Sequence, residues 1–89
     1  MELVWDKTKN RENIEKHGVS FEEARLAFCD ANRKVENDSD HSTPSEKRYF
    51  LYGDTGQGIV TVKFTMREGN IRIIGAGYWR KGKKKYEQG

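Results

Sequence analysis

Cysteine is nearly absent from this sequence, and so are long apolar runs. Cys29 is the only cysteine in 89 residues, which excludes an internal disulfide, a thiol zinc cluster and a redox pair of cysteines. We expect Cys29 to be a small core residue beside Phe28. The two histidines, His17 and His41, lie too far apart for a paired zinc motif, and the acids are scattered. The sequence therefore predicts no metal site and no cofactor.

The apolar content of the chain is low. Charges at Glu2 and Asp6 interrupt the start, and no later segment has the length of a signal peptide or a membrane span. We therefore expect a cytoplasmic protein without a membrane partner. Because 34% of the residues are hydrophobic and 35% are charged, the core must be small, and we expect an oligomer or a complex.

Positive charge is concentrated at the C-terminal end. Five of the 17 lysines and arginines lie from Tyr78 onward, where Glu87 is the one acid, so this segment carries a charge of +4. The whole chain carries +3, which leaves −1 for the remaining residues. A nearly neutral body with a cationic end is typical of a polyanion-binding surface, and phosphate is the simplest partner.

Two helices are predicted in the N-terminal half, after a short strand over residues 2–5. The first helix spans residues 7–16, begins at the carboxylate of Asp6 and ends at Gly18. The second helix opens with a capping box, in which Ser20 and Glu23 each satisfy a backbone amide of the other. Its core-facing stripe is predicted to be Phe21, Ala24 and Phe28.

The second half of the chain has the alternation of a β-sheet. A brief strand over residues 33–37 precedes an exposed loop, residues 37–45, made of turn-forming residues. Three further strands are predicted to form an antiparallel meander: residues 47–52, 59–65 and 70–76. The predicted core, together with Phe21 and Phe28, consists of Val60, Val62, Phe64, Ile71 and Ile73. By the same alternation Lys63 and Arg72 point to the outer face of the sheet.

We predict one α+β domain over residues 1–89, with two N-terminal helices, a small antiparallel sheet and a basic C-terminal segment.

The order and spacing of many residues resemble the BrnT-like toxins. The first block of matching residues is Trp5-Asp6, Lys9, Asn13, Lys16 to Val19, Phe21 to Ala24, Phe28 and Asp30. The second block is Glu46 to Arg48, a turn at Gly53, Thr65 to Arg67, Ile71 to Ile74 and Tyr86-Glu87. This resemblance implies a RelE-like α+β fold and a ribonuclease toxin of a type II toxin-antitoxin system. It also implies a cognate antitoxin as partner, RNA as substrate, and either a homodimer or a toxin-antitoxin heterotetramer.

One position departs from the family pattern. Many members follow Ile-Arg-Ile-Ile with Ser-Ala-Arg, whereas this chain has Gly75-Ala76-Gly77, so the family arginine is missing at Gly77. Arg80 and Lys81 are the candidates to replace it.

RNA cleavage without a metal needs an acceptor for the ribose 2′-hydroxyl proton, a donor for the departing 5′-oxygen, and cations for the charge on phosphorus. Lys63 or His41 is the predicted acceptor, and Tyr86 or Lys81 the predicted donor. Arginine binds two phosphate oxygens at once. The predicted catalytic residues are Arg48, Lys63, Arg72, Arg80, Tyr86 and His41. The predicted RNA-binding residues are Arg67, Tyr78, Trp79, Lys81, Lys83, Lys84 and Lys85.

Each candidate also has a simpler interpretation. Arg48 and Arg72 can be surface charges that pair with Glu46 or Glu68, His17 can be a cation at a helix C-terminus, and the terminal lysines can be a solvated end. Two other functions therefore stay open: a binding module for nucleic acid or antitoxin that has lost cleavage, and a small structural partner protein.

Overall fold

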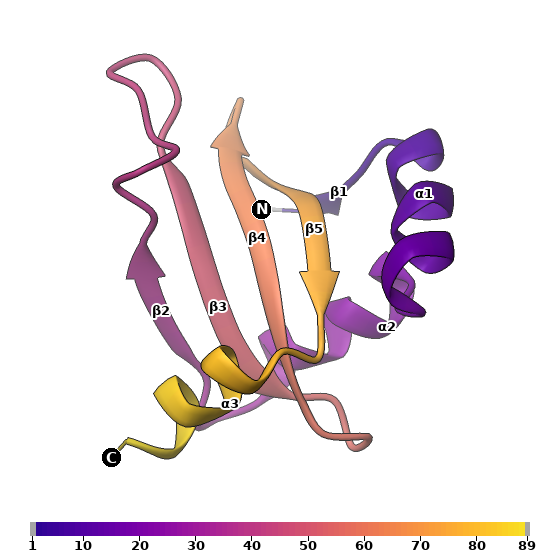
Figure 1. The fold of residues 1–89 in the computed structure, drawn as a ribbon. Coiled ribbons are helices and arrows are strands. Elements are labelled where there is room, and N and C mark those ends of the chain that lie inside the picture. The colour runs from indigo at the N-terminus through magenta and orange to yellow at the C-terminus, as the bar shows by residue number, and fades with distance from the viewer. Residues whose placement is uncertain (1, 89) are drawn as a thin grey trace.

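The computed structural model describes residues 2–88, which form a five-stranded sheet with helices on both faces (Figure 1). The strands are β1 (Leu3–Val4), β2 (Lys34–Asn37), β3 (Arg48–Asp54), β4 (Ile59–Arg67) and β5 (Asn70–Gly77). Their order in the sheet is β1-β5-β4-β3-β2. The α+β class and the meander are confirmed. The sheet is mixed, not purely antiparallel, because β1 pairs parallel to β5. A strand of two residues carries no sequence signal for its partner or its direction.

The helices are α1 (Lys7–His17), α2 (Phe21–Ala24), the 3₁₀ helix η1 (Arg25–Cys29) and α3 (Arg80–Glu87). Asp6 caps α1 by accepting from the Lys9 amide at 3.2 Å, and Gly18 ends it in the left-handed conformation. Half of the expected capping box is present, since Ser20 Oγ accepts from the Glu23 amide at 3.0 Å. The Glu23 carboxylate instead accepts from the hydroxyl of Tyr78, which draws it away from the Ser20 amide.

The second predicted helix divides into an α turn and the 3₁₀ helix η1. Phe21, Ala24 and Ala27 are fully buried at a spacing of three, which suits the tighter 3₁₀ repeat. Cys29 is exposed at the end of η1, so its assignment to the core was wrong. Ala27 takes the inward position instead and packs against Gly53, where a Cβ would lie 2.6 Å from the Ala27 carbonyl oxygen. Gly53 is consequently a packing glycine inside β3 and not a turn residue.

The hydrophobic core lies between the sheet and the α2–η1 segment, as the alternation predicted. Its buried residues are Val19, Phe21, Ala24, Ala27, Leu51, Val60, Val62, Phe64, Ile73 and Ala76. Phe28 and Ile71 are partly buried and pack against this core. Asn13, on the inner side of α1, bonds the carbonyls of Val19 and Ala76 at 2.9 Å and accepts from the Ala76 amide at 3.2 Å. These bonds attach α1 to β5 because a buried amide must have partners.

The basic end of the chain forms a helix that the sequence did not predict. Figure 1 shows α3, in yellow, across the lower end of the sheet on the face opposite α2. The helix lies so close to β4 that a Cβ at Gly82 would be 1.8 Å from Thr61 Oγ1. Two side-chain contacts hold its far end, Lys85 with Glu36 at 3.3 Å and the Tyr86 hydroxyl with Asp30 at 2.6 Å.

Candidate active site on the outer face of the sheet

Three adjacent strands place cationic side chains in rows on the outer face. Arg48 of β3, Thr65 of β4 and Arg72 of β5 are cross-strand partners and form one row. In the next row Lys63 lies between Phe50 and Gly75. Directly paired residues share a face of the sheet. Their sequence neighbours Val62 and Ile73 are buried in the core on the other face. The outward direction predicted for Lys63 and Arg72 is therefore confirmed.

The predicted loop packs back onto the first residue of β3, Arg48, and brings a histidine to this face. The Asp38 amide donates to the Arg48 carbonyl at 2.9 Å, and the Arg48 amide donates to Ser42 Oγ at 2.8 Å. Ser42 Oγ in turn donates to the Asp38 carbonyl at 2.7 Å. These bonds fold the segment into a tight turn that carries His41.

A histidine–carboxylate pair sits on this turn. His41 Nδ1 lies 2.8 Å from Asp38 Oδ2, and the two side chains are 65% and 9% exposed, respectively. The buried carboxylate orients the ring. The second ring nitrogen, Nε2, has no hydrogen-bond partner among residues 2–88, so a bound molecule can exchange a proton with it. Asp38 was not among the predicted site residues, although its place three positions before His41 in a turn-forming segment was a usable signal.

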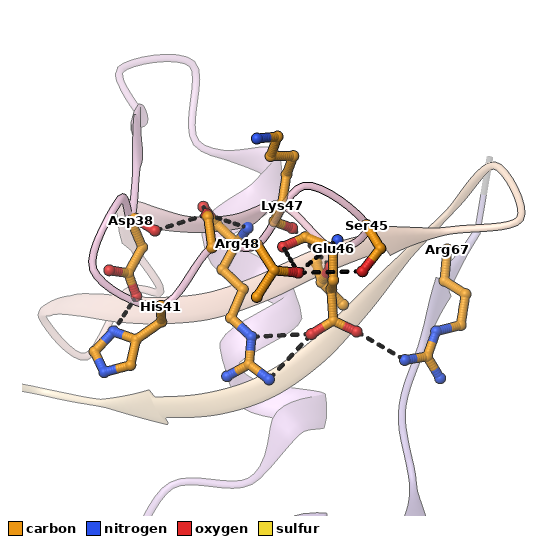
Figure 2. Close-up of polar contacts among 10 residues, drawn as sticks. Asp38, His41, Ser45, Glu46, Lys47, Arg48 and Arg67 are labelled. Carbon is orange, nitrogen blue, oxygen red and sulfur yellow. Dashed lines mark hydrogen bonds and ion pairs between the residues drawn. The ribbon is translucent and has the colours of Figure 1, made fainter.

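Glu46 links two of the arginines (Figure 2). Its Oε1 accepts from Arg48 Nε at 3.1 Å, and its Oε2 accepts from an Arg67 terminal nitrogen at 2.9 Å. The hydrogen bond from Arg67, followed by that from Arg48, lowers the pKa of the Glu46 carboxyl. Glu46 therefore stays ionised and holds both guanidinium groups in place. The pairing of Arg48 with Glu46 that the simpler interpretation expected is present.

These residues line a hollow of about 480 Å³, which we call the cationic hollow. Its lining includes the charged residues Lys9, Asp38, Glu46, Arg48, Lys63, Arg67 and Arg72, together with His41 and Tyr49. Five cations against two carboxylates leave three positive charges, before any charge on His41. In the chain between residues 2 and 88, Lys9, Lys63 and Arg72 take part in no ion pair. Lys9, from α1, was missing from the predicted site because its neighbours in sequence gave no sign that α1 borders β5.

The structure separates the remaining candidates from the hollow. Lys81 and Lys85 border a second pocket beside Lys63, and Tyr78, Arg80 and Lys83 border a third. Trp79 lines both of these pockets. Lys84 is exposed. Tyr86 donates its hydroxyl hydrogen to Asp30, and this bond is the largest cause that raises the pKa of Tyr86 to about 12. Of the six predicted catalytic residues, His41, Arg48, Lys63 and Arg72 come together, while Arg80 and Tyr86 do not join them.

Trp79 fills the space beside Gly77, where the family resemblance led us to expect an arginine. A Cβ at Gly77 would lie 2.4 Å from Cε2 of the Trp79 indole. Lys63 Nζ lies 5.1 Å from the centre of the same ring, within the range of a cation–π contact. The His17 ring packs edge-on against the indole at 5.1 Å, so His17 supports Trp79 in addition to ending α1.

The hollow and the sheet define a small α+β protein with a surface suited to a polyanion. The family model for the ribonuclease toxin BrnT of type II toxin-antitoxin systems matches residues 5–83. The chain belongs to this BrnT toxin family, as its residues had suggested. Comparison with curated proteins finds no match.

Within residues 2–88, no three histidine, cysteine or acidic side chains are grouped to hold a metal ion, and no helix has the length and apolarity to span a membrane.

Proposed function

We propose that this chain is a metal-independent ribonuclease that cleaves RNA in the cationic hollow. The observation that carries the proposal is the placement of the His41–Asp38 pair in the same hollow as Arg48, Arg72 and Lys63. A proton acceptor beside several phosphate-binding cations is the combination that cleavage by the ribose 2′-hydroxyl requires. Membership of a ribonuclease toxin family supports the same reaction.

In the proposed reaction His41 Nε2 removes the proton from the 2′-hydroxyl as that oxygen attacks the adjacent phosphorus. The new bond joins O2′ to phosphorus, and the bond from phosphorus to O5′ breaks. Lys63, first predicted as a proton acceptor, takes the place of the predicted donors Tyr86 and Lys81, which do not line the hollow. Its Nζ supplies the proton to the departing O5′, so the products are a 2′,3′-cyclic phosphate and a 5′-hydroxyl. Asp38 stabilises the charge that His41 gains, because it accepts from the opposite ring nitrogen.

The arginines have two different roles in this proposal. Arg72 forms no ion pair within residues 2–88, so its guanidinium is available to bind the phosphate. Glu46 already holds Arg48 in place by an ion pair with its guanidinium group on the outer face of the sheet. The charge that develops on the non-bridging oxygens then meets two guanidinium groups, of which Glu46 already holds that of Arg48 in place. Arg80, Lys81 and the later lysines contact flanking RNA along α3, away from the reacting bond.

Membership of a type II toxin-antitoxin family implies an antitoxin partner, and we infer that this antitoxin neutralises the toxin. The RelE-like arrangement, the location in the cytoplasm and the assembly as a homodimer or heterotetramer remain predictions. So does the extent of a single domain over residues 1–89.

The test is cleavage of single-stranded RNA by purified protein in EDTA, with His41→Ala, Arg72→Ala and the control Arg25→Ala, an exposed cation of η1 on the opposite face of the sheet. We expect His41→Ala to slow cleavage about 10²-fold or more, Arg72→Ala to slow it by a similar factor, and Arg25→Ala to retain most of the activity. The proposal fails if the protein binds RNA but does not cut it, or if His41→Ala cuts at the normal rate. Salt-sensitive binding without cleavage would identify a nucleic-acid-binding module instead.

A further inference from the structure

A second pocket, of about 320 Å³, adjoins the cationic hollow between α3 and the outer face of the sheet. Phe50 and Tyr52 of β3 and the indole of Trp79 contribute its aromatic surface, and we call it the aromatic pocket. Lys63 borders both the aromatic pocket and the cationic hollow. A molecule with a flat apolar part and an attached phosphate can therefore occupy both at once. The volume lies at the lower end of the range for small-molecule sites, about 300–1,000 Å³.

The aromatic pocket is held in shape by contacts that do not depend on a ligand. The rings of Phe50 and Tyr52 lie nearly parallel, at 6.2 Å between centroids and 22° between planes. The Tyr52 hydroxyl donates to Glu36 Oε1 at 2.6 Å, and Lys85 donates to Glu36 Oε2 at 3.3 Å. These bonds fix the carboxylate of Glu36, itself a lining residue that is 39% exposed.

We propose that the aromatic pocket binds the base of the nucleotide whose phosphate occupies the cationic hollow, and that Glu36 makes it select guanine. Aromatic side chains stack on any base, so Phe50 and Trp79 supply affinity without selectivity. The proposal rests on the proposed ribonuclease function for the identity of the polymer, but base binding can be measured without cleavage.

Selectivity follows from the hydrogen bonds that Glu36 has left to make. An ionised carboxylate is an acceptor with about four lone-pair sites, of which Tyr52 and Lys85 use two. Guanine presents two adjacent donors, N1–H and N2–H₂, that match the two oxygens of a carboxylate. Adenine and cytosine present an amino group beside a ring acceptor, and uracil presents one N–H between two carbonyls. These three bases would direct an acceptor toward the negative oxygens of Glu36.

Calorimetric titration of the intact protein with the four ribonucleoside 3′-monophosphates and with inorganic phosphate tests the proposal. We expect guanosine 3′-monophosphate to bind about tenfold or more tightly than the uridine nucleotide, as for one two-point base contact. Glu36→Gln should reduce this preference to less than about threefold, because its amide replaces one acceptor by a donor. Glu87→Gln, which changes an exposed acid on α3, should leave the preference unchanged.

A second variant covers the case in which Glu36→Gln disturbs the fold. Phe50→Leu keeps an apolar side chain but removes a stacking surface, and it should weaken all four nucleotides while leaving inorganic phosphate unaffected. The proposal is overturned if the four nucleotides bind no better than inorganic phosphate, or if folded Glu36→Gln retains the guanine preference. A guanine preference in a protein that does not cut RNA would refute the proposed ribonuclease and leave the base site standing.

Discussion

The indole of Trp79 lies against the backbone of Gly77, so closely that no side chain fits at position 77. A Cβ there would meet Cε2 and Cζ2 of the indole at 2.4 and 2.5 Å. An arginine at this position, as the family resemblance led us to expect, therefore cannot coexist with Trp79 in its present place. The chain nevertheless retains a cation at this point, because Lys63 Nζ lies above the indole.

Gly77→Ala should displace the indole and destabilise the protein by about 1–3 kcal/mol, the usual cost of overpacking. Urea unfolding followed by circular dichroism measures this loss. Gly75→Ala is a matched control on the same strand, because its Cβ would meet the flexible Lys63 side chain at 3.4 Å. Adding Trp79→Ala to Gly77→Ala removes the clash, so the two changes together should cost less than the sum of the single changes. If the losses of the two single variants simply add in the double variant, the indole is not the cause of the loss in Gly77→Ala.

Gly82→Ala should detach α3 from the sheet. Alanine favours a helix over glycine by about 1 kcal/mol, but its Cβ would lie 1.8 Å from Thr61 Oγ1. The clash outweighs the propensity because a helix of eight residues depends on tertiary packing. We expect a net loss of about 1–3 kcal/mol, with faster hydrogen exchange of the α3 amides. Lys84→Ala, on the exposed side of the same helix, should instead leave the exchange rates similar or slower.

Asn13→Ala should destabilise the protein by about 2–4 kcal/mol, because it removes three buried hydrogen bonds and leaves backbone groups of Val19 and Ala76 without them. Thermal unfolding of the variant measures the loss. Glu12→Ala changes the exposed neighbour on α1 and should have little effect. Equal stability of the two variants would show that Asn13 does not hold α1 on β5.

The hydrogen bond between Tyr86 and Asp30 should stabilise the fold only within a limited range of pH. Tyr86 has its pKa raised from 10.0 to about 12, chiefly by this bond, so its contribution is complete below pH 10 and disappears as the pH rises through 12. Asp30 has its pKa lowered from 3.8, again chiefly by Tyr86, so its contribution is complete above pH 3.8 and disappears on further acidification through the lowered pKa. The bond therefore stabilises the fold between these limits.

Ultraviolet titration of the tyrosines, with Tyr86→Phe as the reference, measures this shift. Asp30→Asn should return the pKa of Tyr86 toward 10.0 because it removes the negative acceptor. An unchanged titration in Asp30→Asn would show that another group raises the pKa. Glu87→Gln, beside Tyr86 but not bonded to it, serves as the charge-matched control.

Much of the architecture could be predicted because it depends on neighbouring residues. Asp6 and Gly18 mark the ends of α1 through caps that are local in sequence. The alternation from Val60 to Phe64 identifies both faces of β4, since residues two apart share a face. The helix α3 escaped prediction because it contains Gly82, which disfavours a helix, and four lysines whose like charges repel one another. Its stability comes from contact with Thr61 and Tyr52.

The sequence by itself determined the family, the helix caps and the outward direction of Lys63 and Arg72. Only the tertiary structure decided which cations act together. The residues of the basic C-terminal end lie at two pockets and in the hydrogen bond between Tyr86 and Asp30. Lys9, His41 and Arg72 come from distant segments and line one hollow. The reason is that charge clustering along a chain does not specify which side chains meet, whereas the register of the strands and the packing of the loop onto Arg48 do.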